Sequence, residues 1–430
     1  MRLALINPPW NFEGSIYFGC REPHLPLELG YAQALLRQAG HETLLCDAHL
    51  TGQGMAALCE EVAGFTPDIT VVTTAPSYLF WRCAPPELRV PSDFLRTLDG
   101  RGGRTVAIGP HGSVTPAATL RKLRVDAVVR GECEEVLVAL AGTDWRNVTS
   151  LGLRRGNDIC ITGGPAAGRF TDLPALHWPD GWIQAHHHHH HRFDSPQHGP
   201  GAEVEASRGC PFACSFCAKI DFRDRYRRRD LDTLLQEIDT LAAQGVTYLY
   251  FIDEIFLPQV PLLKALEARR LQFGIQTRID LWKPDLLRLL GAAGCVSIEA
   301  GVESLTEAGR DELAKNCRLS TDQLAALLVE ARRHVPFVQA NLIGMEQDDP
   351  RMVARWREQM NEAGVWSNEP VPLYPYPSSP SYRARWGEPD DLAWERAHAH
   401  YLAAFDAFSD IQTDRPLPLA QLEAACQAEV

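Results

Sequence analysis

The sequence lacks the features that would place this protein in a membrane or on nucleic acid. No stretch approaches the roughly 20 consecutive apolar residues of a membrane span, and the apolar run near the start is too short for a signal peptide. Basic residues are fewer than acidic ones, with 42 Lys and Arg against 55 Asp and Glu. An acidic chain is a poor match for a dedicated nucleic-acid binder. We therefore expect a cytoplasmic protein that uses neither membrane nor nucleic acid as a partner.

Paired cysteine motifs are also missing. The chain has 12 cysteines among 430 residues, and only Cys210, Cys214 and Cys217 lie close together. Such usage is typical of reduced thiols in the cytosol rather than of a disulfide framework. A structural zinc site usually adds a second short pair of Cys or His ligands, and no second close cysteine pair exists. A zinc loop and three unrelated buried cysteines are therefore the weaker interpretations of this trio.

The spacing of the three cysteines favours an iron–sulfur cluster. They form a C-x3-C-x2-C pattern, with the aromatic Phe216 directly before the third. Three thiolates on one tight loop can hold three irons of a cubane and leave the fourth iron without a protein ligand. Such an open position marks a metal centre that carries out chemistry. We therefore expect Cys210, Cys214 and Cys217 to be the metal ligands of a catalytic [4Fe–4S] cluster.

Strands and helices alternate along the first 145 residues, and the strands are nearly continuous apolar runs. This pattern predicts an α/β fold with a doubly wound parallel sheet, whose ligands bind beyond the carboxyl ends of the strands. A dinucleotide site is not expected, because no G-x-G-x-x-G follows the first strand. The residues expected at those ends are Asn7, Pro8, Pro9, Trp10, Thr73, Thr74, Gly109, Pro110, His111, Gly131 and Glu132.

A second domain is expected over residues 201–380, where six strand–helix units end in polar residues. This repeat predicts a partial (β/α)6 parallel barrel with its site at the carboxyl mouth. Residues 146–200 are expected to form a linker, and residues 381–430 a helical C-terminal extension that either caps the mouth or packs outside it. The expected strands cover residues 203–207, 247–252, 274–277, 296–300, 338–343 and 370–374.

Two polar runs permit more than one interpretation. Six consecutive histidines at 186–191 could bind metal, but adjacent residues cannot all converge on one ion, so a solvated or substrate-facing loop is favoured. Five arginines follow the cysteines, and a solvated helix start is favoured for them over a site for an anionic substrate or an electron donor. These arginines are Arg223, Arg225, Arg227, Arg228 and Arg229.

The cysteine loop resembles the signature of the radical S-adenosylmethionine (SAM) superfamily. The resemblance implies that the free iron binds the amino and carboxylate groups of SAM, and that the reduced cluster cleaves it to a 5′-deoxyadenosyl radical. Residues 251–254 resemble the family's segment for the SAM amino group, and residues 301–304 resemble its G-x-E-S segment. Residues 341–344 resemble the segment beside adenine, although Met345 and Glu346 replace the more usual Pro-Gly. The implied SAM contacts are Phe216, Asp253, Glu254, Arg278, Glu303, Ser304 and Asn341. For the carboxylates among them, an ordinary surface role is the alternative.

The first domain resembles the cobalamin-binding domain that precedes the cluster in one large radical SAM class. The matching segments are residues 7–9, 26–31, 39–41, 109–111 and 130–132. The D-x-H-x-x-G loop that supplies a histidine to cobalt in other such domains is absent, and Asn7 to Trp10 take its place. His111 could be an axial ligand, but a hydrogen-bonding role is favoured for a turn histidine. The alternative is a doubly wound domain that holds no cofactor.

Together these resemblances imply an enzyme with a [4Fe–4S] cluster, SAM and cobalamin as cofactors. The leading hypothesis is C-methylation of an unactivated carbon of a small molecule, with flavodoxin or ferredoxin as electron donor. A first rival is a non-methylating rearrangement or cyclisation that uses both cofactors. A second is a catalytically inactive cobalamin-binding sensor, against which the intact cysteine trio argues. An RNA-modifying enzyme is disfavoured by the acidity of the chain.

Overall fold

A computed structural model describes residues 1–16, 23–76, 83–156, 158–186, 199–405, 412 and 414–424. The first sheet has seven strands in the order β2-β1-β3-β4-β5-β6-β7, of which β1 to β5 are parallel. The expected doubly wound sheet is therefore confirmed. The strands are β1 (Arg2–Asn7), β2 (Glu42–Asp47), β3 (Ile69–Thr73), β4 (Arg104–Ile108), β5 (Ala127–Val129), β6 (Leu151–Arg155) and β7 (Asp158–Thr162).

Helices cover both faces of this sheet because successive side chains of each strand point to opposite faces. Leu3 and Leu5 pack in one apolar cluster with α1 (Leu27–Gln38) and α7 (Glu134–Gly142). The intervening Ala4 and Ile6 of β1 pack on the other side with three further helices. Those helices are α3 (Met55–Phe65), α4 (Arg89–Leu98) and α6 (Pro116–Leu123).

The expected linker contributes to the first sheet. Strands β6 and β7 form an antiparallel hairpin, and β6 pairs antiparallel with β5. The sheet thus continues past the predicted boundary at residue 145. Of the six histidines only His186 is described; the others lie outside the described residues.

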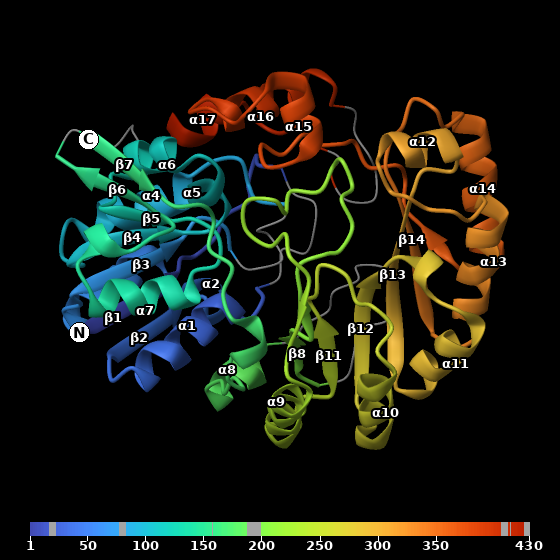
Figure 1. The fold of residues 1–430 in the computed structure, drawn as a ribbon, viewed down its shortest axis with the longest axis horizontal. Helices are drawn as coiled ribbons and strands as arrows, with labels where there is room; N and C mark the ends of the chain where they lie inside the picture. Colours follow the sequence, from blue (N-terminus) through green and yellow to red (C-terminus); the bar gives the residue numbers. More distant parts are fainter. Residues whose placement is uncertain are drawn as a thin grey trace.

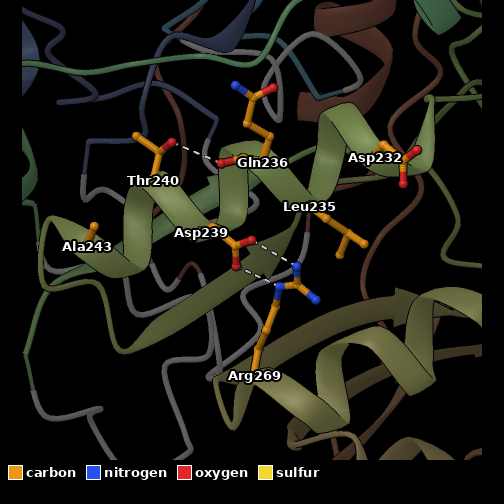
Figure 2. A pocket seen from close by; sticks show the side chains of 7 residues that line it. All are labelled: Asp232, Leu235, Gln236, Asp239, Thr240, Ala243 and Arg269. Carbon is orange, nitrogen blue, oxygen red and sulfur yellow. Dashed lines mark hydrogen bonds and ion pairs between the residues drawn. The ribbon is translucent and has the colours of Figure 1, made fainter.

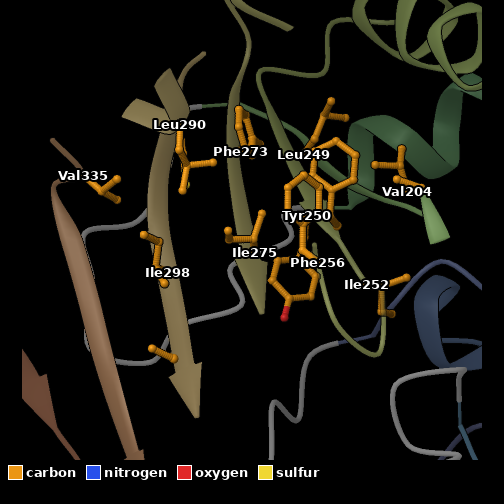
Figure 3. Packing of buried hydrophobic residues seen from close by; sticks show 14 of the residues in the cluster. Val204, Leu249, Tyr250, Ile252, Phe256, Phe273, Ile275, Leu290, Ile298 and Val335 are labelled. Carbon is orange, nitrogen blue, oxygen red and sulfur yellow. The ribbon is translucent and has the colours of Figure 1, made fainter. Parts of the chain in front are cut away.

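The second sheet has six parallel strands in the order β15-β14-β13-β12-β11-β8, which confirms the partial barrel. Figure 3 shows side chains of neighbouring strands, such as Leu249, Ile275 and Ile298, packed together with Leu290 of the outer helix layer. The strands are β8 (Gly201–Val204), β11 (Tyr248–Phe251), β12 (Gln272–Thr277), β13 (Cys295–Glu303), β14 (Phe337–Leu342) and β15 (Trp366–Ser367). The helices are α9 (Leu231–Ala243), α10 (Val260–Arg269), α11 (Pro284–Ala292), α13 (Thr321–Arg332) and α14 (Pro350–Glu362).

The position expected for the last strand was wrong. We placed it at residues 370–374, but β15 lies at Trp366–Ser367, and Val371 forms only an isolated bridge with Ile343. Pro370 and Pro372 explain the difference, because proline has no N–H to donate to a strand ladder.

The segment that contains the three cysteines, residues 210–217, belongs to a loop that runs between the two sheets (Figure 1). Strand β9 (Ser207–Arg208) and strand β10 (Arg227–Arg228) pair antiparallel, and the residues between them form what we call the cluster loop, 209–226. This short ribbon separates the loop from β8, whereas we had expected one continuous strand up to Ser207. Both ends of the loop are thereby held side by side.

The C-terminal tail lies over the first sheet and the cluster loop (Figure 1). It contains α15 (Pro380–Trp386), α16 (Ala393–Ala403) and α17 (Leu419–Ala424). The Ser381 N–H donates to Ser215 O of the cluster loop at 2.8 Å, and Trp394 stacks on His111 with ring centroids 4.2 Å apart. The tail therefore contacts both domains. Within the described part of the chain, every helix is too short or too polar to cross a membrane.

Candidate functional site

The three cysteines lie within eight residues of the cluster loop and differ in their exposure to solvent. Cys214 is buried, while Cys210 and Cys217 are half-buried. Burial raises the pKa of the Cys210 and Cys214 thiols. Lys219 steadies the loop, because its Nζ donates to Cys210 O at 2.8 Å and pairs with Asp224 at 2.5 Å. Among the described residues, no three His, Cys, Asp or Glu side chains are arranged to hold a single metal ion.

Gly209, the first residue of the cluster loop, adopts a backbone conformation that a residue with a side chain could not adopt here without strain. Its φ of +80° lies in the left-handed region, and a Cβ there would stand 2.2 Å from Arg225 O. A side chain would therefore force two backbone segments apart, in addition to a cost of about 1–2 kcal/mol for the left-handed conformation. The Gly209 N–H also donates to Glu254 at 2.6 Å.

We expect Gly209→Ala to lower cluster loading without unfolding the sheets. The substitution displaces the ribbon next to Cys210, whereas the buried strands do not depend on it. Iron and sulfide content after anaerobic reconstitution measures the effect, and Gly387→Ala, at a positive φ in open space, is the control. Full iron content in Gly209→Ala would show that the close backbone contact at Gly209 is not needed for cluster binding.

Asp253 and Glu254, which follow β11, hold the cluster loop in place. Asp253 is fully buried and accepts hydrogen bonds from Ala206 N at 2.9 Å and from the Ser207 hydroxyl at 2.5 Å. Glu254 accepts from Gly209 N and from Arg223 at 2.9 Å. Their expected contact with the SAM amino group stays a prediction, since the described partners of both carboxylates belong to the strand and loop that carry the cysteines.

Arg278, at the carboxyl end of β12, presents a free donor beside the loop. It pairs with Asp280 through Nε and one terminal nitrogen, at 3.1 and 2.7 Å, and its guanidinium lies 4.1 Å from the ring centre of Phe212. The other terminal nitrogen is buried without a hydrogen-bond partner among the described residues. A buried unpaired donor is costly, so this nitrogen suits an anionic ligand such as a carboxylate.

Glu303 at the end of β13 has a strained backbone. Its φ is +70°, which is uncommon for a residue with a side chain and is concentrated at functional sites. One carboxylate oxygen pairs with the buried Lys315 at 3.1 Å, and the other has no partner among the described residues. The neighbouring Ser304 donates to Asp348 at 2.8 Å. Lys315 was not predicted, since it follows a short helix and belongs to no motif.

The remaining predicted SAM residues lie nearby in the fold. Phe216 is half-buried on the cluster loop, and Asn341 lies on β14, where its side-chain oxygen accepts from Gln339 at 2.6 Å. Residues from the loop, β12, β13 and β14 thus gather at the carboxyl end of the second sheet. Which of them contact SAM stays a prediction.

At the carboxyl edge of the first sheet, Asn7 links three segments. Its side chain donates to Asp47 at 3.0 Å and accepts from Trp10 at 2.7 Å and from Thr73 at 3.2 Å. Pro8 and Pro9 continue from β1 toward Trp10. The loop that replaces the missing histidine motif is therefore held by hydrogen bonds to β2 and β3 and by one within the loop itself.

Thr74 and His111 offer unsatisfied polar atoms at the same edge. The Thr74 hydroxyl and His111 Nδ1 are buried without a hydrogen-bond partner in the described structure. Gly109, at φ +121°, brings the backbone so close to Thr74 that a Cβ would meet its hydroxyl at 2.5 Å, and Pro110 follows at the start of a short helix. Burial lowers the pKa of His111 to about 3, so its imidazole is neutral.

A buried ionic network joins the two domains. Arg208 pairs with Glu134 at 2.8 Å, with Glu132 at 3.1 Å and with Glu205 at 2.9 Å. All four side chains are at most 4% exposed. Sequence reasoning missed Arg208, because nothing in its neighbourhood along the chain marks it as buried.

The solvated helix start that we favoured for the arginine run was wrong for three of the five. Arg223 pairs with Glu205 and Glu254 at 3.0 and 2.9 Å. Arg229 pairs with the buried Glu237 at 2.8 Å, and Arg227 pairs with Glu132. Only Arg225 and Arg228 are exposed, so the run is not a continuous docking surface.

Glu28, in the first turn of α1, is a buried carboxyl that sequence reasoning missed. It is 1% exposed, and neither oxygen has a hydrogen-bond partner in the described structure. Burial raises its pKa from 4.5 to about 8, with a smaller opposing effect from Arg223. Glu28 is therefore protonated at neutral pH.

We expect Glu28→Gln to stabilise the protein at high pH. Below pH 4.5 the carboxyl is protonated in both the folded and the unfolded chain, and its stabilising contribution is fully present. As the pH rises from 4.5 toward 8, the unfolded chain loses this proton first and the contribution is lost, up to about 5 kcal/mol. Urea unfolding at pH 5.5 and 8.5 measures this, with the exposed Glu135→Gln as control. An equal gain at both pH values would contradict the prediction.

A surface hollow lies elsewhere, along the outer face of α9. Figure 2 shows its lining residues, among which Asp239 pairs with Arg269 at 2.7 Å. No predicted site residue lines it, so we do not place the functional site there.

Comparisons with known proteins agree with this geometry. The Radical SAM superfamily matches residues 204–358. The anaerobic magnesium-protoporphyrin IX monomethyl ester cyclase of Cereibacter sphaeroides is 26% identical over 408 residues, which cover 87% of this chain and 63% of the relative. The hopanoid C-3 methylase of Methylococcus capsulatus is 26% identical over 377 residues, which cover 81% of this chain and 67% of the relative. The chain thus spans about two thirds of the length of these curated relatives.

Two solved structures share the fold over both domains. The radical SAM methyltransferase TsrM from Kitasatospora setae, with cobalamin and a [4Fe–4S] cluster bound, matches with a TM-score of 0.70 and 18% identity, covering 88% of this chain and 76% of TsrM. The cobalamin-dependent radical SAM enzyme OxsB, with aqua-cobalamin bound, matches with a TM-score of 0.66 and 14% identity, covering 86% of this chain and 53% of OxsB.

Proposed function

We propose that this chain, a radical SAM protein with the two-domain fold of cobalamin-dependent members of that superfamily, is a C-methyltransferase that acts on a small molecule. The observation that carries the proposal is the position of the cluster loop. The loop bears the three cysteines and is tied by Arg208 and Arg227 to Glu132, at the carboxyl edge of the first sheet. A cofactor at that edge and a cluster on the loop would therefore face one another.

The residues present fit the proposed cofactors. Cys210, Cys214 and Cys217 would hold the [4Fe–4S] cluster, and the free nitrogen of Arg278 and the unpartnered oxygen of Glu303 offer a donor and an acceptor to SAM. Thr74 and His111 offer buried polar atoms to cobalamin. Bound together, cluster, SAM and cobalamin supply radical hydrogen abstraction and a transferable methyl group.

The chain's own contribution is to position these groups and exclude water. Asp253, Glu254 and Lys219 hold the loop, and Trp394 of the tail stacks on the buried His111. Fixed polar groups in a closed site act without reorganisation during the reaction. We propose that His111 is a hydrogen-bonding residue and not the axial ligand of cobalt, because its Nε2 already lies 3.4 Å from Pro86 O.

Non-methylating cyclisation is the second candidate. It is favoured by the similarity to the cyclase, which equals the similarity to the methylase at 26% identity and covers more of this chain. Both candidates need a one-electron donor, for which we propose a flavodoxin or ferredoxin. Arg223 and Arg229 are buried and paired with glutamates, so they do not supply a docking surface for this electron donor.

Anaerobic reconstitution separates the two candidates. The protein is loaded with iron, sulfide and cobalamin, and SAM-derived products are followed with reductant and a panel of candidate small molecules. Substrate-dependent S-adenosylhomocysteine together with 5′-deoxyadenosine supports methylation, and 5′-deoxyadenosine alone supports cyclisation. Failure to retain cobalamin would overturn the assignment of the first domain.

A further inference from the structure

We propose that Glu132 is a positioning residue, which clamps the cluster loop to the first domain and thereby sets the separation of the two cofactors. The inference rests on the proposed function for the identity of those cofactors. The clamp itself consists of contacts between described residues. It assigns to Glu132 a role other than the cofactor contact predicted from the sequence.

Both oxygens of Glu132 are bound by arginines from the two ends of the cluster loop. Arg208, directly before the loop, donates to Oε2 at 3.1 Å. Arg227, directly after it, donates to Oε2 at 3.1 Å and also to Oε1. Since Arg208 and Arg227 are paired across the β9–β10 ribbon, one carboxylate holds both strands that close the loop. The carboxylate is 1% exposed, so water does not compete for it.

Glu132 is itself held firmly by the first domain. Gly131 has a φ of +83°, and a Cβ there would stand 2.4 Å from Ala166 O. The Gly131 N–H donates to the Ser113 hydroxyl at 2.9 Å, and the Glu132 N–H donates to Ala166 O at 3.1 Å. Ser113 belongs to the short helix that carries His111. The clamp therefore runs from the proposed cobalamin edge directly to the ribbon next to Cys210.

Glu132 pairs with arginines at both ends of the cluster loop, whereas the nearby Glu134 pairs only with Arg208. Glu134 also pairs with Arg208, at 2.8 Å, but it makes no contact with Arg227, which follows the loop. Arg208 keeps two carboxylate partners when either glutamate is lost, because Glu205 remains. Only loss of Glu132 therefore removes the carboxylate partner of Arg227, which keeps its hydrogen bond to Gly168 O at 2.7 Å. Glu134→Gln is the matched control, with the same chemical change at a buried site in the same network.

The full-length Glu132→Gln and Glu134→Gln proteins test the clamp without relying on activity. Hydrogen–deuterium exchange of the unloaded proteins should show amides of residues 209–226 exchanging about tenfold faster in Glu132→Gln, with a smaller change in Glu134→Gln. Exchange in β1 and β3 should stay as in the wild type, which excludes general unfolding. Equal exchange of the loop in both variants would overturn the clamp.

The loaded enzymes test whether the clamp sets cofactor geometry. Pulsed electron paramagnetic resonance between the reduced cluster and cob(II)alamin should give a broader distance distribution in Glu132→Gln than in Glu134→Gln. The ratio of methylated product to 5′-deoxyadenosine should fall about tenfold, because small displacements of reacting groups are costly. An unchanged distribution and ratio would overturn the positioning role. Failure of the wild type to bind cobalamin would instead count against the proposed function, and the exchange comparison would still decide the clamp.

Discussion

Replacement of Cys214 by Ala should abolish all formation of 5′-deoxyadenosine from SAM. A cubane needs its thiolate ligands, and Cys214 is the buried member of the trio, so no water molecule readily takes its place. The variant should contain little iron and lack the signal of a reduced cluster in electron paramagnetic resonance. S-Adenosylhomocysteine from a methyl transfer that precedes radical chemistry can persist, which separates the two uses of SAM.

The control for this experiment is Cys160→Ala. Cys160 is half-buried and lies on β7 in the hairpin of the first sheet, away from the cluster loop. Its replacement should leave the iron content and both products unchanged. A full cluster in Cys214→Ala, or zinc in place of iron in the wild-type protein, would overturn the assignment of the cysteine loop.

Replacement of Arg208 by Met should cause the largest loss of stability of any single arginine in the loop region. The Arg208 side chain is 1% exposed and pairs with Glu132, Glu134 and Glu205, which are at most 4% exposed. Removal of one partner from a buried ion pair costs about 3–5 kcal/mol, since it leaves uncompensated charge in the interior. Methionine keeps the apolar stem of the side chain but supplies no positive charge.

Thermal unfolding of Arg208→Met and Arg225→Met measures this effect. Arg225 lies in the same basic run but is exposed, and its replacement should change stability by less than about 0.5 kcal/mol. Arg208→Lys should be intermediate, because an ammonium keeps the charge but not the planar fork that reaches several carboxylates. Equal stability of Arg208→Met and Arg225→Met would contradict the proposed interdomain network.

Residues whose role depends on their neighbours along the chain were predictable. The three cysteines form their pattern within eight residues, and the turn at Gly209 follows from its position beside them. The burial of β1 on both faces could likewise be read from its continuous apolar run. The strand at residues 370–374 failed for a local reason too, since two prolines outweighed its apolar side chains.

Residues whose role depends on distant partners were not predictable. Glu132 looked like a cofactor contact because it follows a strand of the first sheet, and Arg227 looked like part of a solvated run. They pair with each other across 95 positions of sequence, which no local pattern contains. Lys315 and Glu28 escaped notice for the same reason, since burial reveals itself only when the surrounding elements have been placed.

The sequence by itself thus determined the kind of chemistry, because the ligand set of a cluster and the periodicity of parallel strands are both encoded within short segments. Only the tertiary structure decided how the two halves are joined. It placed the tail on His111 and on the cluster loop, and it paired three of the five arginines, which we had expected at the surface, with buried carboxylates. The physical reason is that ion pairing and desolvation act through space, and the chain brings these charges together only when it folds.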